Sequence, residues 1–132
     1  MRKQRIYGFG LAVLLVVSTT AAYSDQRYRP IPGYRCMMLN LTERQLMDPT
    51  LEVPVRASPS VSAPVVASAG AVVVVRDAEA PINGFVQMLT PDARQAWIAA
   101  SVLRPYRSES NPAARCVPEV LPNGRIGFGS PN

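Results

Sequence analysis

The chain has 132 residues, with 14 Lys and Arg, nine Asp and Glu, two Cys and no His. Without histidine, Ser-His and Cys-His nucleophilic catalysis is excluded. A pair of carboxylates remains possible, but nothing in the spacing of the acidic residues selects two of them. The acidic residues are also dispersed, and no phosphate-binding glycine motif is present. The sequence therefore predicts no enzyme, no metal and no cofactor.

Residues 1–24 have the pattern of a secretory signal peptide. Three basic residues precede an apolar run over residues 6–17, and small residues follow. Cleavage after Ser24 fits the small-x-small rule, and cleavage after Ala22 is the alternative. An uncleaved anchor helix is the competing interpretation, but the apolar run is shorter than the roughly 20 residues that span a bilayer. We expect a periplasmic or secreted protein, with no stable membrane insertion after cleavage.

Most of the net charge of +5 belongs to this segment. Without residues 1–24 the chain keeps 11 basic and nine acidic residues, a net charge of +2. All 11 basic residues are arginines, and they are scattered from Arg27 to Arg125. Because nucleic-acid binding needs clustered positive charge, the sequence predicts no nucleic-acid partner.

The two cysteines, Cys36 and Cys116, stand on either side of the central part of the chain. An exported protein meets an oxidising compartment, so we predict a disulfide between them. It would close a loop of roughly 80 residues and contribute on the order of 4 kcal/mol in the chain-entropy model. Two free thiols or two metal ligands are the alternatives. The absence of histidine and of a Cys-x-x-Cys pair argues against metal binding.

The exported part, about 108 residues, is long enough for one domain of modest core. We assign residues 25–50 to an N-terminal extension, residues 51–106 to the domain, and residues 107–132 to a C-terminal extension with a mobile tail. In the first extension, residues 36–41 could form a strand, and Thr42 is a suitable N-cap for one short helical turn. The glycine-rich end of the chain is short of core-forming residues, which predicts an irregular tail.

Between residues 51 and 106 the apolar residues predict a mainly β domain. Asn83-Gly84 is a strong hairpin signal, and Pro91 suits the first central position of a turn over residues 90–94. Strands are expected at residues 51–55, 65–66, 72–76, 85–89, 95–99 and 101–103. Alternation selects as core residues Val53, Val55, Val66, Val73, Val75, Val86, Met88, Ile98 and Leu103.

The same stretch resembles the bacterial SH3-like (SH3b) domain family over about 50 residues. The family's valine-arginine strand, serine-proline loop, strands and closing Gly-Trp-Val strand have counterparts in order and at similar spacing. The matching residues are Val55-Arg56, Ser58-Pro59, Pro64-Val65-Val66, Val72 to Val75, Asn83-Gly84-Phe85-Val86 and Ala96-Trp97-Ile98 through Leu103. The resemblance implies a small SH3-like β-barrel, here with irregular extensions that the disulfide would join.

The sequence departs from the family pattern at three positions. Ser58 stands where family members commonly have Gly, Ala96 replaces the Gly before Trp97, and Phe85 replaces a frequent Trp. Glycine usually marks a positive φ or a close approach, so the first two changes predict different backbone dihedrals or a covered surface.

The family resemblance implies a recognition module for peptidoglycan or an extended peptide. Its ligand would lie between the loops 56–64 and 77–84, against aromatic side chains that stack on sugars or prolines. The candidate ligand-binding residues are Arg56, Ser58, Pro59, Phe85, Trp97 and Tyr106. Core packing of Phe85 and Trp97 and simple solvation of Arg56 are the alternative interpretations.

Two functions are compatible with these observations. The first is an exported, non-catalytic module that binds cell-wall peptidoglycan or a peptide through a loop-lined aromatic groove. The second is a structural or accessory subunit of an envelope or secretion assembly, whose valine-rich edge or joined flanks contact a partner protein. The two differ in whether Phe85, Trp97 and Tyr106 converge on an exposed face.

Overall fold

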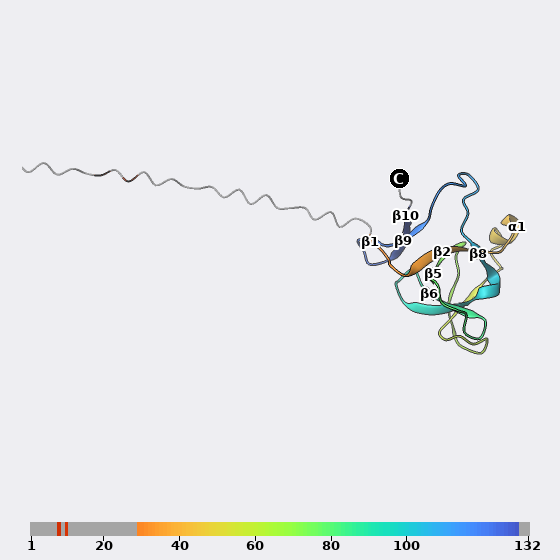
Figure 1. Ribbon diagram of the computed structural model, residues 1–132. Coiled ribbons are helices and arrows are strands. Elements are labelled where there is room, and N and C mark those ends of the chain that lie inside the picture. The colour runs from red at the N-terminus through yellow and green to blue at the C-terminus, as the bar shows by residue number, and fades with distance from the viewer. Residues whose placement is uncertain (1–7, 9, 11–28, 130–132) are drawn as a thin grey trace, which may run out of the picture.

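The computed structural model describes Gly8, Gly10 and residues 29–129 (Figure 1). The expected signal peptide lies outside the described residues apart from its two glycines. The described part is mainly β, and it contains no helix long and apolar enough to cross a membrane. Its elements are β1 (Arg29–Pro30), β2 (Tyr34–Leu39), α1 (Glu43–Leu46), β3 (Pro54–Arg56), β4 (Val65–Ser68), β5 (Val72–Arg76), β6 (Phe85–Leu89), β7 (Gln95–Ala99), a 3-10 turn (Ala100–Val102), β8 (Leu103–Pro105), β9 (Val117–Val120) and β10 (Ile126–Gly129).

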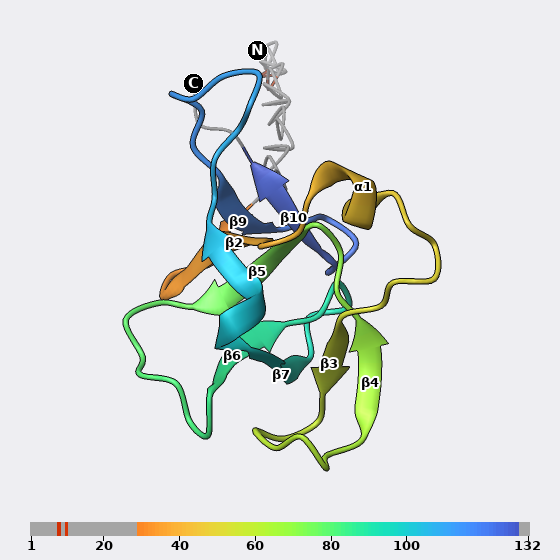
Figure 2. The same cartoon turned by 90° about the vertical axis from the view of Figure 1, so that its right-hand side faces the viewer.

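Seven strands form one antiparallel sheet in the order β4-β3-β7-β6-β5-β2-β8 (Figure 2). The expected closed barrel is wrong, because β4 and β8 lie at the two ends of this order and no ladder joins them within residues 29–129. β8, expected to complete the barrel, pairs instead with β2. The sheet therefore extends beyond the stretch that resembles the SH3-like family, since β2 belongs to the N-terminal extension.

The two extensions are more regular than expected. β2 pairs with β5 on one side and β8 on the other, so it is an internal strand of the large sheet. β1, β9 and β10 form a separate three-stranded antiparallel sheet in the order β1-β9-β10. β1 and β10 thus lie in one sheet on either side of β9, and the expectation of irregular extensions is corrected.

Glycines explain why the C-terminal segment forms a strand. A Cβ atom on Gly127 would lie 2.7 Å from the Leu121 side chain, and one on Gly129 would overlap the Glu119 carboxylate. Because the two glycines have no side chain, Leu121 and Glu119 can lie across β10. The irregular tail expected from the low content of core-forming residues is therefore wrong for β10, because glycine permits close pairing between strands.

The local turn predictions are confirmed. Asn83 and Gly84 have positive φ angles of 50° and 78°, and Ile82 and Phe85 exchange two backbone hydrogen bonds of 2.8 Å around them. This is the geometry that favours Asn-Gly in two-residue hairpins. Thr42 caps α1, because its hydroxyl accepts from the Gln45 N–H at 3.2 Å while the Gln45 side chain accepts from the Thr42 N–H at 2.9 Å.

The hydrophobic core lies on one face of the seven-stranded sheet. Six of the nine predicted core residues are buried, and Val86 and Leu103 are half-buried against them. Val66 is a correction, because its side chain is 43% exposed. The register of β3 and β4 shifts so that Ala67 faces Val55 while Val65 faces Arg56, which leaves Val66 as the extra residue of a bulge. The bulge turns Val66 out of the core, and Ala67 takes its place.

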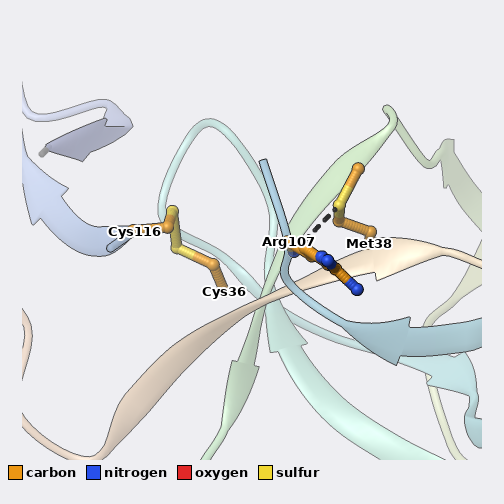
Figure 3. Close-up of a disulfide and its surroundings, with 4 residues drawn as sticks. All are labelled: Cys36, Met38, Arg107 and Cys116. Carbon is orange, nitrogen blue, oxygen red and sulfur yellow. Dashed lines mark hydrogen bonds between the residues drawn. A yellow bond between two sulfur atoms is a disulfide. The ribbon is translucent and has the colours of Figure 1, made fainter. Parts of the chain in front are cut away.

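The disulfide between Cys36 and Cys116 is present, as predicted, with the two Cα atoms 6.0 Å apart (Figure 3). Cys36 lies within β2, and Cys116 immediately precedes β9. The bond therefore connects the large sheet to the three-stranded sheet. Nearby, the Arg107 backbone N–H donates to the Met38 sulfur at 3.4 Å, which holds the start of the connection between β8 and β9 against β2.

Replacing Val73 by Asp tests the core. Val73 is 4% exposed and belongs to the core cluster, so Val73→Asp buries a carboxylate without a partner. We expect a loss of at least about 3 kcal/mol in the free energy of unfolding, measured by urea denaturation followed by circular dichroism. Val61→Asp is the matched control, because Val61 is 77% exposed and this variant should unfold like the wild type. A Val73→Asp variant with wild-type stability would show that the core assignment is wrong.

Removing the disulfide tests the connection between the sheets. The sequence separation of 80 predicts that a Cys36→Ala, Cys116→Ala double variant loses about 4 kcal/mol of unfolding free energy. Urea denaturation of the double variant and of the dithiothreitol-reduced wild type would measure this loss. Amide exchange should accelerate more in β9 and β10 than in β6 and β7, because the hairpin loses its covalent attachment. Equal exchange rates with and without the bond would contradict this role.

Candidate functional site

Arg56 and Trp97, two of the predicted site residues, are direct cross-strand partners on β3 and β7. Both side chains are half-buried. The Arg56 guanidinium donates through Nη1 to the Ala63 carbonyl at 3.0 Å, and this bond ties the end of β3 to the following loop. The structure therefore brings these two residues together, and the bond to the Ala63 carbonyl holds the Arg56 guanidinium in place.

The loops 57–64 and 77–84 meet directly. The Asn83 side-chain amide donates to the Pro59 carbonyl at 3.2 Å, so the space expected between the loops is bridged at this point. Ser58 is exposed and Pro59 half-buried, and the Ser58 carbonyl accepts from the Ser60 N–H at 2.8 Å. These two residues shape the loop, and the backbone carbonyl of Pro59 is occupied by the neighbouring loop.

Two departures from the family pattern have structural counterparts. Neither Ser58 nor Ala96 has a positive φ angle. Ala96 is fully buried opposite Met88 on the core face, in agreement with a covered position. The small side chain at this position therefore serves packing between β6 and β7.

The three aromatic candidates do not converge. Phe85 lies on the same face of the sheet as Trp97, since its partner Ala99 is two residues from Trp97, but Phe85 is only 6% exposed. Tyr106 follows β8, at the opposite end of the strand order from β3 and β4. It lines a separate hollow with Met38 and Leu41. Trp97 is thus the one of the three that combines partial exposure with a neighbouring predicted site residue.

The register instead aligns five polar and aromatic side chains across five adjacent strands. We call Arg56, Trp97, Gln87, Arg76 and Tyr34 the cross-strand row. Trp97 faces Arg56 on one side and Gln87 on the other, and Tyr34 faces Arg76. The Arg76 guanidinium donates to the Gln87 side-chain oxygen at 3.3 Å, which joins the two halves. Directly opposed residues point to the same side of a sheet, so the row forms one continuous strip.

The strip lies on the side of the sheet away from the core. Strand neighbours of the row, such as Ile98 and Met88, belong to the core cluster, and side chains alternate between faces. Arg76 is exposed, and the other four members are half-buried. Arg76 also forms an exposed ion pair with Glu79, with Nε and Oε1 2.8 Å apart, which contributes little to stability. The Arg56 guanidinium gives the strip positive charge, whereas the charge of Arg76 is balanced by Glu79.

Sequence reasoning missed three members of the row. Gln87 could have been found, because it occupies the same outward phase as Phe85 in a predicted strand. Tyr34 and Arg76 could not, because their position depends on pairing between β2 and β5, which are far apart in the chain. Among residues 29–129, no group of three or more His, Cys, Asp or Glu side chains is placed to hold a metal ion.

The turn between β6 and β7 contains the buried polar residue Thr90, which is 2% exposed. Its hydroxyl donates to the Asp92 carboxylate at 2.5 Å and accepts from the Arg94 N–H at 3.1 Å. The hydroxyl bond is the main cause of a lowered pKa at Asp92, and the Arg94 guanidinium, 2.7 Å from Asp92 Oδ2, adds to it. This turn is therefore fixed by an ionised carboxylate.

Thr90→Val should raise the pKa of Asp92 towards its ordinary value of 3.8, because the variant cannot donate to the carboxylate. A lowered pKa means that the ionised group stabilises the fold above pH 3.8, and that this contribution is lost as the pH falls through the folded-state pKa. NMR titration of the Asp92 carboxyl carbon would measure the shift. Asp48, whose pKa is lowered by hydrogen bonds from Thr50, is the internal control and should not change. An unchanged pKa at Asp92 would show that Thr90 is not the cause.

Comparisons of the chain with protein-family models, with curated proteins and with solved structures gave no match.

Proposed function

We propose that this protein is an exported, non-catalytic module of SH3-like type that binds cell-wall peptidoglycan or a peptide. The observation that carries the proposal is the cross-strand row, in which Trp97 stands between Arg56 and Gln87 on the side of the sheet away from the core. The binding surface is then this strip of the sheet, in place of a groove lined by the loops.

The chemistry of the row suits a ligand that carries both ring faces and polar groups. An indole offers a flat apolar surface on which a sugar ring or a proline stacks at small entropic cost. The Gln87 amide can donate and accept beside it. The Arg56 guanidinium can pair with carboxylates, which peptides and peptidoglycan both carry. Because Arg56 is held by Ala63, little side-chain freedom is lost on binding.

The disulfide supports export, since such bonds persist mainly in oxidising compartments outside the cytoplasm. The N-terminal pattern of basic, apolar and small residues points in the same direction. A periplasmic or secreted location would place the row where cell-wall fragments are present.

A specific observation also favours the accessory-subunit alternative. β4 is an edge strand, and its Val65 and Val66 side chains are exposed together with Val61 in the preceding loop. An apolar edge strand without a charged residue is a surface that a partner protein can cover. This alternative would be preferred if the row binds no cell-wall material.

Co-sedimentation with purified sacculi tests the proposal. The full chain, expressed with its own N-terminal segment and purified in oxidised form, should bind saturably. Trp97→Ala should weaken binding at least about tenfold, because the stacking surface is lost. Far-ultraviolet circular dichroism would verify that the variant is folded.

Met47→Ala is the matched control. Met47 is an exposed apolar residue next to α1 and outside the row, so its truncation should leave binding unchanged. Equal loss in both variants would indicate non-specific hydrophobic adsorption. Absence of sedimentation with the wild type would favour the partner-protein alternative.

A further inference from the structure

A second feature, independent of the cross-strand row, is an apolar cavity of about 370 Å³ between the large sheet and β10. It is lined by the core residues Val55, Val73 and Met88 and by Ile126 and Phe128 of β10. The connection 69–71 between β4 and β5 completes the rim. A cavity of this size can accept a bulky apolar group, and Phe128, which lines it, is 51% exposed.

The lining residues carry only two polar side chains, those of Ser68 and Thr90, and Ser68 is exposed on β4. None of its lining residues is charged. Among the lining residues, Thr90 is already bonded to Asp92 and Arg94, so its hydroxyl is engaged. A charged ligand would lose its hydration without gaining a partner, so the cavity selects an uncharged, apolar group.

The rim, by contrast, carries unpaired backbone groups. Leu121 N–H donates to the Arg125 carbonyl, which sets the alternation of the β9 and β10 ladder. By this alternation the backbones of Ile126 and Phe128 point away from β9, and Ile126 N–H indeed donates outwards to the Pro91 carbonyl at 2.9 Å. Phe128 has no backbone partner on this side within residues 29–129.

A similar edge lies on β4. Ala69 N–H donates to the Val53 carbonyl at 2.9 Å, so the backbone of Ser68, one residue earlier, points away from β3. Ser68 and Phe128 both line the cavity. Free peptide groups thus stand on two sides of an uncharged apolar cavity.

From this combination we infer that the cavity and the edge of β10 at Phe128 bind an extended, uncharged polypeptide segment of a partner protein. The segment adds as a strand beside β10, bonds to the Phe128 backbone, and places one bulky apolar side chain in the cavity. An apolar small molecule would use the cavity and leave the edge unpaired. A polypeptide matches both, because it carries amide groups at the spacing of a strand.

The disulfide gives this site its outer wall. Cys116 immediately precedes β9, and β9 carries β10 in its ladder, so the bond to Cys36 keeps Ile126 and Phe128 beside the sheet. The site is therefore expected in the oxidised protein.

The test uses two blocked pentapeptides, acetyl-Thr-Val-Leu-Val-Thr-amide and the same peptide with Ala at its centre. Each is titrated into the oxidised, ¹⁵N-labelled full chain while backbone amide signals are followed by NMR. The leucine peptide should shift the signals of Ser68, Leu89 and Phe128 saturably. It should bind at least about tenfold more tightly than the alanine peptide, because only leucine fills the cavity.

Ala71→Trp fills the cavity from an exposed position on its rim and should weaken leucine-peptide binding at least about tenfold. Ala113→Trp, in the exposed loop before Cys116, is the matched control and should bind normally. If Ala71→Trp fails to fold, the comparison of the two peptides in the wild type still decides.

Two results would overturn the inference: no saturable shifts at these amides, or equal affinity for the two peptides. The outcome is distinct from that of the sacculus experiment. Trp97→Ala should leave the peptide titration unchanged, and Ala71→Trp should leave sacculus binding unchanged, so either site can fail without the other.

Discussion

The arrangement of residues 29–129 depends on β2. This strand pairs with β5 along one edge and with β8 along the other, and its Cys36 is bonded to Cys116. The first contact makes β2 part of the large sheet, the second sets β8 at the end of that sheet, and the third attaches the C-terminal sheet. A strand from the N-terminal extension therefore fixes three segments that are far apart in the sequence. Without it, neither the cross-strand row nor the cavity would be complete.

β5 shows how the two faces of the sheet come to differ. Val73 and Val75 belong to the core cluster, whereas Val74, between them, must face the other way, and yet Val74 is equally buried. Its partner in β2 is Cys36, and it lines the cavity together with Ile126 and Phe128. The C-terminal sheet therefore covers this part of the outer face. Arg76, two residues after Val74 on the same face, is exposed, so the C-terminal sheet does not cover this position. Arg76 belongs to the cross-strand row.

The sequence predicted what local chemistry decides. Asn83-Gly84, Pro91 and the Thr42 cap act over a few residues, and the structure confirms each of these turns. The strand expected at residues 72–76 is also confirmed as β5, in which Val73, Val74 and Val75 are all buried. Arg56 and Trp97 were identified as site residues from the family resemblance, and the structure makes them neighbours. Tyr106 was grouped with them, although it lies at the other end of the strand order.

What the sequence could not predict depends on pairing between distant segments. The exposure of Val66 follows from a one-residue register shift, since an extra residue in β4 reverses the phase of its alternation. β10 depends on the packing of Leu121 over Gly127 and of Glu119 over Gly129. From composition alone, these glycines predict an irregular tail. In both cases the decisive partner is a backbone or side chain on another strand. The unpaired edge of β10 at Phe128 could not be predicted for the same reason, because an edge is recognisable only when the strand order is known. Its unpaired peptide groups are then the place where an additional strand can pair.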